Sequence, residues 1–147
     1  RGNVSRYDSY DIDVEEVEVI REGKDIAIIA VGKMVEIAID AAENLSKLGI
    51  EATIINPRII KPLDISSICE KLKDITDIVT IEDNIRDGGF GVMTLNELNK
   101  VGIDKKVEIL AFPDEYIEHG KTESIFEEYG MDVTGVTNSI KKFLNIK

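Results

Sequence analysis

Residues 26–32 read Ile-Ala-Ile-Ile-Ala-Val-Gly, and this stretch decides the fold. It is continuously apolar, rich in β-branched side chains and closed by glycine, which is typical of a strand buried on both faces of a parallel sheet. Apolar residues then recur at helical spacing from Met34 to Leu48, and Gly49 provides a natural C-terminal stop. A buried strand followed directly by an amphipathic helix indicates the βα unit of an α/β protein.

The same unit repeats along the chain. The alternating residues 17–19 predict a half-exposed edge strand that pairs antiparallel. Asp64 is the predicted N-cap of the second helix. This order predicts a three-layer α/β sandwich: a mostly parallel sheet of about five strands with one antiparallel edge strand, and helices on both faces. The further predicted strands are 52–55, 78–81 and 107–112, and the further helices are 65–72, 90–101, 124–129 and 136–144.

Composition restricts the class of protein. The 147 residues, 43% hydrophobic and 32% charged, suit one globular domain. The 29 acidic residues outnumber the 18 basic ones, and a net charge of -11 argues against nucleic acid or an anionic membrane as partner. A single cysteine fits a reducing compartment, and no apolar run approaches the roughly 18 residues that span a bilayer. We expect a soluble, cytoplasmic domain.

The excess acid is concentrated in two segments. Residues 1–22 contain seven acids and three bases, and residues 114–132 contain seven acids and one base. The last fifteen residues contain three bases and no acid. Runs of this kind are usually solvated faces, and an acidic face repels anions. A phosphate site would therefore lie elsewhere in the molecule.

A glycine-rich run, Gly-Gly-Phe-Gly at residues 88–91, precedes a predicted helix as a phosphate-binding loop does. It lacks the Gly-Lys-Ser/Thr of a P-loop and the spacing of a dinucleotide fingerprint, and the acids Glu82, Asp83 and Asp87 beside it would repel a phosphate. We therefore interpret Gly88, Gly89 and Gly91 as glycines that allow the helix to pack closely on the sheet.

Three other candidates have a chemical and a structural interpretation. Glu82 and Asp83 follow a predicted strand at the edge where α/β sheets bind ligands, so they could hold Mg²⁺ or act as acid and base, but we favour a capping or interface role. His119 is the only histidine, and no nucleophile or second metal ligand is visibly coupled to it, so we interpret it as an exposed loop histidine. Cys69 falls on an apolar helix face, so we interpret it as a core residue rather than a nucleophile. We expect no catalytic, cofactor-binding or metal-binding residue in this chain, and a candidate interface or loop site formed by Glu82, Asp83, Gly88, Gly89, Gly91 and His119.

Several short runs, taken in order from about Val17 to Leu144, carry a family likeness. They are Arg-Glu-Gly-Lys-Asp-Ile-Ala-Ile at 21–28, Gly-Lys-Met-Val at 32–35, Lys-Pro-Leu-Asp at 61–64, Ile-Glu-Asp-Asn at 81–84 and Gly-Gly-Phe-Gly at 88–91. Together they resemble the C-terminal domain of the transketolase-like, thiamine-diphosphate-dependent enzymes. Phe-Pro-Asp-Glu-Tyr-Ile-Glu-His-Gly at 112–120, with Tyr-Gly-Met-Asp at 129–132, is similar to the branch of that family that condenses pyruvate with glyceraldehyde 3-phosphate.

The resemblance implies a full enzyme that releases carbon dioxide and begins non-mevalonate isoprenoid synthesis, with a link to thiamine biosynthesis. It implies thiamine diphosphate and Mg²⁺ held between a pyrophosphate-binding and a pyrimidine-binding domain, in a homodimer. The motifs of those two domains, including a Gly-Asp-Gly metal motif, do not occur in this sequence. The resemblance thus implies that residues 17–147 are the third domain, with a structural and interface role and no activity alone, and that residues 1–16 are a linker from a catalytic domain.

The first residues add one substrate-binding candidate. Arg-Gly-Asn at 1–3 resembles the tail of an Arg-Tyr-Pro-Arg-Gly run in the same branch, in which an arginine helps to hold the substrate phosphate. The resemblance implies that Arg1 is either this phosphate-holding arginine or its neighbour. A guanidinium suits phosphate binding because its planar fork makes two hydrogen bonds to the phosphate oxygens. Two alternatives stay open: the third domain of a transketolase or of a 2-oxoacid dehydrogenase's decarboxylating subunit, and a freestanding regulatory module with an effector at residues 88–91.

Overall fold

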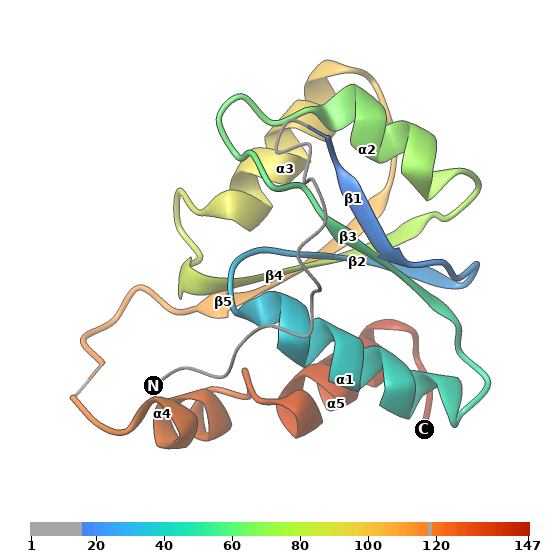
Figure 1. The fold of residues 1–147 in the computed structure, drawn as a ribbon. Coiled ribbons are helices and arrows are strands. Elements are labelled where there is room, and N and C mark those ends of the chain that lie inside the picture. The colour runs from blue at the N-terminus through green and yellow to red at the C-terminus, as the bar shows by residue number, and fades with distance from the viewer. Residues whose placement is uncertain (1–15, 118) are drawn as a thin grey trace.

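Apolar strands and amphipathic helices alternate along the chain in the predicted order. The computed structural model describes residues 16–117 and 119–147, which form one sheet covered by helices on both faces (Figure 1). The predicted three-layer α/β sandwich is confirmed. The strands are β1 Glu18–Arg21, β2 Ile26–Ala30, β3 Ala52–Asn56, β4 Asp77–Ile85 and β5 Lys106–Phe112. The helices are α1 Met34–Ser46, α2 Ile65–Leu72, α3 Phe90–Lys100, α4 Thr122–Glu128 and α5 Val133–Phe143.

The sheet has the strand order β1-β3-β2-β4-β5, in which β1 is antiparallel to β3 and every other pair is parallel. The central strand β2 is buried along its whole length. Its side chains alternate between two cores, with Ile26 and Ile28 on one face and Ala27 and Ile29 on the other. Because helices cover both faces, both sets must be apolar, and this explains the unbroken apolar run in the sequence.

Each face of the sheet has its own hydrophobic core. The core between the sheet, α1 and α5 contains Leu45, Val136 and Ile140, and α4 lies on the same side of the sheet (Figure 1). The core beneath α2 and α3 contains Leu72 and Leu98. Burying one such side chain stabilises the fold by about 1.5–3 kcal/mol, so these two cores supply most of the favourable free energy of folding.

The edge strand β1 is half-buried throughout, as its alternating sequence predicts. Two ion pairs hold it against neighbouring segments: Arg21 with Glu51 at 2.8 Å and Arg58 with Glu18 at 3.1 Å. The Ser46 hydroxyl donates to Glu51 as well, and this bond together with Arg21 lowers the pKa of the Glu51 carboxyl. The ends of the antiparallel strand are thus held by ion pairs in addition to the β ladder with β3, which includes Glu18, Val19 and Arg21.

Helix ends follow local sequence signals. Asp64 caps α2 as predicted, accepting from the Ser67 amide at 3.0 Å, and Asp132 caps α5 by accepting from the Gly135 amide at 2.9 Å. The expectation that Leu48 belongs to the apolar face of the first helix is wrong. The helix ends at Ser46, and Leu48 is 54% exposed, because the chain has already begun the turn that Gly49 closes with a φ of +81°.

Strand β4 is longer than the sequence predicts. It continues past Ile81 to Ile85, after an irregularity in its register with β5. Its last residues, 83–85, are exposed, so polar side chains are tolerated there and hide the strand signal. Arg86 completes the pairing: its amide donates to the Phe112 carbonyl at 2.8 Å, and its guanidinium donates to the Ile109 carbonyl at 3.1 Å.

Candidate functional site

The carboxyl ends of the parallel strands meet at one edge of the sheet, which we call the carboxyl edge. It comprises the ends of β2, β4 and β5 with the segments that follow them, 31–33, 82–91 and 113–121. The strand order reverses beside β2, which lies between β3 and β4. In open α/β sheets, ligands bind at such a switch point because the crossover helices diverge there and leave a crevice.

Glu82 occupies the place that a phosphate would take at the N-terminus of α3. Its side chain is 2% exposed, and its two oxygens accept from the amides of Phe90 and Gly91, each at 2.8 Å. The carboxylate satisfies two of the donors that every helix leaves free, and its charge opposes the helix dipole. The glycine-rich loop is therefore closed by an anion of the chain's own.

The glycines of this loop serve close packing. A Cβ on Gly89 would come within 2.6 Å of the Glu82 carboxylate, and a Cβ on Gly91 would come within 2.5 Å of the Thr80 hydroxyl oxygen. Gly88 is exposed and has a φ of +71°, a backbone conformation that other residues rarely adopt. The structure thus brings Glu82, Gly89 and Gly91 together as one packed unit, with Gly88 as its turn.

Asp83 points to a different partner. Its carboxylate lies 3.1 Å from the ammonium of Lys33, which follows β2, and the same ammonium lies 4.9 Å from the centre of the Phe126 ring in α4. Both charged side chains keep contact with solvent, at 54% and 37% exposure, so the pair itself contributes little stability. Its effect is geometric: Lys33, Asp83 and Phe126 connect β2, β4 and α4 at the switch point.

His119 lies apart from this group. It is exposed, in the segment between β5 and α4, and among the described residues Glu82 bonds to Phe90 and Gly91 and Asp83 pairs with Lys33, not with His119. Its neighbour Tyr116 is 83% exposed. The segment is held at its ends, since the Tyr129 hydroxyl donates to the Glu115 carboxylate, a bond that raises the pKa of Tyr129. The candidate Arg1 lies outside the described residues.

A metal site, a reactive cysteine and a membrane span would each require particular features of the described residues. No group of three or more His, Cys, Asp or Glu side chains is placed there to hold a metal ion. Cys69 packs beside the core beneath α2, and burial raises the pKa of its thiol. Among the same residues, none of the helices is both long and apolar enough to cross a bilayer.

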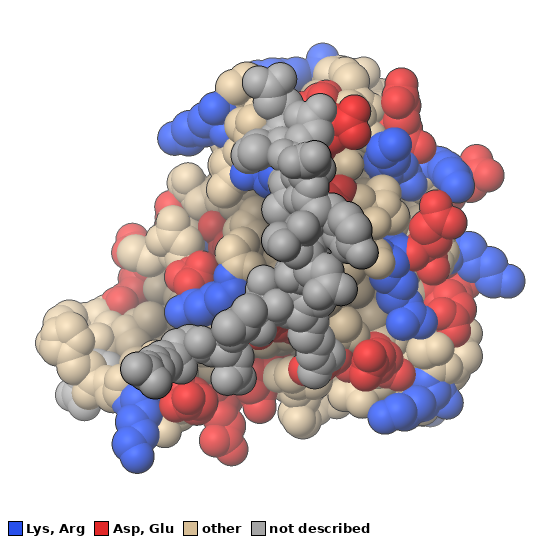
Figure 2. All heavy atoms as spheres, in the orientation of Figure 1, with Lys and Arg blue, Asp and Glu red and all other residues tan. Residues whose placement is uncertain are grey.

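The charged surface agrees with this description. Figure 2 shows acidic and basic side chains interspersed over much of the face in view, with acidic groups along its lower border, in the region of α4. The segment 114–132, which includes α4, contains seven acids and one base. Such a surface does not attract anions, which fits a carboxyl edge whose helix N-terminus is already neutralised by Glu82.

These features define a class of protein: an α/β domain in which a carboxylate of the chain itself, Glu82, occupies the anion site at a helix N-terminus beside the switch point. The chain belongs to the transketolase C-terminal domain family, because the family model described as "Transketolase, C-terminal domain" matches residues 15–136. The resemblance drawn from the short sequence runs is thus confirmed at the level of the family.

Curated relatives carry a more specific name. A 1-deoxy-D-xylulose-5-phosphate synthase from Clostridium perfringens (strain SM101 / Type A) is 43% identical over 128 residues, which are 86% of this chain and 21% of the relative. A synthase of the same name from Caldanaerobacter subterraneus subsp. tengcongensis is 43% identical over 123 residues, 84% of this chain and 20% of the relative. The chain therefore spans about a fifth of the length of the curated relatives it matches.

Solved structures share the fold. A structure titled "Split gene transketolase, inactive beta4 tetramer" superposes with a TM-score of 0.82 at 27% identity, covering 92% of this chain and 44% of that one. A transketolase mutant from Pichia stipitis superposes with a TM-score of 0.64 at 20% identity, covering 89% of this chain and 18% of that one, and shows the fold alone.

Sequence analysis did not single out Lys33 as a site residue. It stands in the Gly-Lys-Met-Val run that carried the family likeness, directly after the buried strand β2. A lysine at the carboxyl end of a central strand is a usable signal, because that position faces the switch point of the sheet. Its partners could not be found in this way, since Asp83 and Phe126 come from distant segments of the chain.

Proposed function

We propose that this chain is the C-terminal domain of a 1-deoxy-D-xylulose-5-phosphate synthase. The 43% identity to curated synthases across 86% of the chain carries this proposal. The whole enzyme would condense pyruvate with glyceraldehyde 3-phosphate to give 1-deoxy-D-xylulose 5-phosphate and carbon dioxide. It would do so in the cytoplasm with thiamine diphosphate and Mg²⁺, as a homodimer, at the start of isoprenoid and thiamine biosynthesis.

In this proposal the domain has a structural role. Residues 17–147 pack against the pyrophosphate- and pyrimidine-binding domains, and residues 1–16 are the linker from the preceding one, with Arg1 as a ligand of the substrate phosphate. Cofactor and metal belong to the other domains. The filled N-terminus of α3 supports this assignment, because Glu82 already takes the two amides, of Phe90 and Gly91, that a pyrophosphate would need.

We assign the contact with the catalytic domains to the carboxyl edge, where Asp83, Gly88 and His119 are exposed. Two large apolar side chains support this choice: Tyr116, which follows β5, is 83% exposed, and Ile85, the last residue of β4, is 41% exposed. Exposed aromatic and aliphatic side chains of this kind are enriched at protein interfaces.

The two alternatives have less support. The transketolase structures share the fold at 27% and 20% identity, below the 43% of the synthases, and this favours the synthase over a transketolase or a 2-oxoacid dehydrogenase subunit. A freestanding regulatory module with an effector at residues 88–91 would require the ligand to displace the buried Glu82 carboxylate from its two amide donors.

The proposal is tested by transplanting the domain. Residues 17–147 replace the aligned region of the Clostridium perfringens synthase in one chimera and of the Pichia stipitis transketolase in a matched second chimera. We expect the synthase chimera to form 1-deoxy-D-xylulose 5-phosphate from pyruvate and glyceraldehyde 3-phosphate with thiamine diphosphate and Mg²⁺, and the transketolase chimera to be inactive in its own assay. If only the transketolase chimera is active, the domain is assigned to a transketolase instead of a synthase. Formation of product by the isolated chain would contradict the structural role.

A pair of surface variants in the synthase chimera locates the contact. Tyr116→Asp at the carboxyl edge should lower activity roughly tenfold, because a buried interface anchor typically contributes more than about 1.4 kcal/mol. Leu48→Asp changes another exposed apolar side chain, at the opposite edge of the sheet, and should leave activity unchanged. Equal effects of the two variants would remove the carboxyl edge from the proposal.

A further inference from the structure

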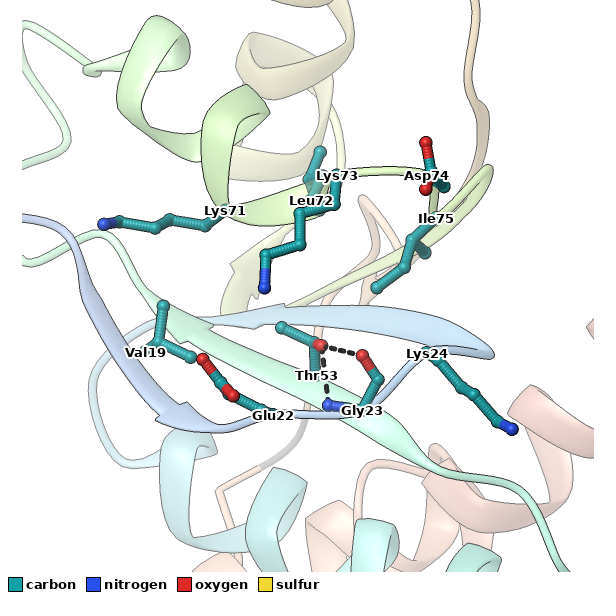
Figure 3. A pocket seen from close by; sticks show the side chains of 10 residues that line it. All are labelled: Val19, Glu22, Gly23, Lys24, Thr53, Lys71, Leu72, Lys73, Asp74 and Ile75. Atoms are coloured by element: carbon teal, nitrogen blue, oxygen red, sulfur yellow. Dashed lines mark hydrogen bonds between the residues drawn. The ribbon is translucent and has the colours of Figure 1, made fainter.

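A cavity of about 170 Å³ lies at the other edge of the sheet, where the parallel strands begin. We call this the amino edge. The cavity is enclosed by the end of α2 and the turn that follows it, by the turn between β1 and β2, and by Thr53 of β3 (Figure 3). The proposed function concerns the carboxyl edge, so ligand binding at the amino edge is independent of it.

The base of the cavity is apolar. Val19, Leu72 and Ile75 line it, and Leu72 and Ile75 are buried. The polar atoms at the base already have partners: the Thr53 hydroxyl donates to the Gly23 carbonyl at 2.7 Å and accepts from the Gly23 amide at 2.9 Å. A ligand in this cavity would therefore meet hydrocarbon below, and its polar group would have to be recognised at the rim.

The rim contains one cation directed inward, and the Glu22 carboxylate also lines it. In Figure 3 the Lys73 side chain extends from the end of α2 toward Thr53, whereas Lys24, Lys71 and Asp74 point away from the cavity. The Lys73 ammonium makes no ion pair or hydrogen bond within residues 16–117 and 119–147. An unpaired cation over an apolar base is suited to an anion that has an apolar part.

The backbone at Lys73 has an unusual conformation. Its φ of +51° and ψ of -123° lie in a region that residues with a side chain rarely adopt. Glycine would fill this position without strain. The chain instead has a lysine there, and its side chain turns back over the cavity.

We infer that this cavity binds a small organic anion, a carboxylate or a phosphate monoester with a short apolar chain. The chain lies against Val19, Leu72 and Ile75, and the anionic group pairs with the Lys73 ammonium. The volume limits the ligand's size, because drug-sized ligands need pockets of roughly 300–1,000 Å³. The Glu22 carboxylate also lines the rim and repels negative charge, so a singly charged carboxylate is favoured over a phosphate monoester, which carries up to two charges near neutral pH.

The test is a titration of the isotope-labelled chain, followed by amide chemical shifts, with hexanoate and with butyl phosphate at millimolar concentrations. The two ligands distinguish a carboxylate from a phosphate source. We expect shifts of the Gly23, Thr53 and Ile75 amides with at least one of them. Hexylammonium has the same apolar chain with the opposite charge and should leave these amides unchanged.

Variants then test the charge. Lys73→Gln should weaken binding about three- to tenfold, the effect of losing one charge-assisted contact at a solvated rim. The matched control Lys71→Gln removes a neighbouring lysine that points away and should leave binding as it was, while Glu22→Gln should strengthen it. The inference is overturned if neither anion shifts the three amides, if hexylammonium shifts them equally, or if Lys73→Gln behaves like Lys71→Gln.

Discussion

The carboxylates of Glu82 and Asp83 at the carboxyl edge have partners, whereas Lys73 at the amino edge has none among the described residues. At the carboxyl edge, Glu82 is buried against the N-terminus of α3, and Asp83 is paired with Lys33. At the amino edge, Lys73 has no partner in the described residues and lies over an apolar cavity. Helix N-termini gather at the carboxyl ends of parallel strands, so that edge normally attracts anionic ligands. Here the chain's own carboxylates have taken that role.

This difference indicates what each edge can still do. At the carboxyl edge, Glu82 already satisfies the amides of Phe90 and Gly91 at the N-terminus of α3, so they cannot hold an external anion, which fits the interface role proposed for this edge. The amino edge retains an uncompensated cation, so it keeps a capacity to bind a small anion. Three substitutions, at Glu82, Thr53 and Asp64, test how each region depends on these contacts.

Glu82→Ala should have the largest effect on stability. The substitution leaves the amides of Phe90 and Gly91 without an acceptor in a buried place, which we expect to lower the free energy of unfolding by about 2–4 kcal/mol. Equilibrium urea unfolding measures this loss. The matched control, Asp83→Ala, removes the adjacent carboxylate from a solvated ion pair and should cost at most about 1 kcal/mol. Similar losses in both variants would mean that the carboxyl edge is not built around Glu82.

Thr53→Val should have an intermediate effect, confined to the amino edge. Valine keeps the shape of threonine but leaves the Gly23 amide and carbonyl without their partner, at a cost of about 1–2 kcal/mol. Urea unfolding gives the loss, and Thr76→Val, at an exposed threonine nearby, is the control with little expected change. An unchanged stability in Thr53→Val would show that the cavity wall does not depend on this bond pair.

Local signals predicted most of the fold. The apolar run at residues 26–31 could be assigned because both faces of β2 are buried, and the Asp64 cap could be assigned because donor and acceptor are three residues apart. Contacts between distant segments could not be predicted in this way. The Lys33–Asp83 pair and the cavity over Thr53 exist only once the strands have taken their order, and no spacing in one sequence encodes that order directly. Glu82 lies between these two cases. Its place after a strand favours a capping or interface role, but the sequence does not indicate that its donors are the amides of Phe90 and Gly91.

The smallest expected effect is a pH dependence at the N-terminus of α2, the helix that follows the carboxyl end of β3. The Ser67 amide and hydroxyl both donate to the Asp64 carboxylate, at 3.0 and 2.7 Å, and these bonds lower the pKa of Asp64 below its usual 3.8. A lowered pKa means that the folded chain holds fewer protons than the unfolded chain in this range. The carboxylate therefore stabilises the fold above pH 3.8, and this contribution is lost as the pH falls through the folded-state pKa.

Asp64→Asn isolates that contribution, because asparagine retains a side-chain acceptor for the Ser67 amide but does not titrate. The melting temperatures of the two proteins should differ by a constant amount at pH values well above 3.8, with the original chain the more stable, and should converge as the pH falls below it. Calorimetry over the acid range measures the difference. A gap that is the same at every pH would show that Asp64 acts only as a neutral acceptor, and that its negative charge contributes nothing to stability at this helix N-terminus.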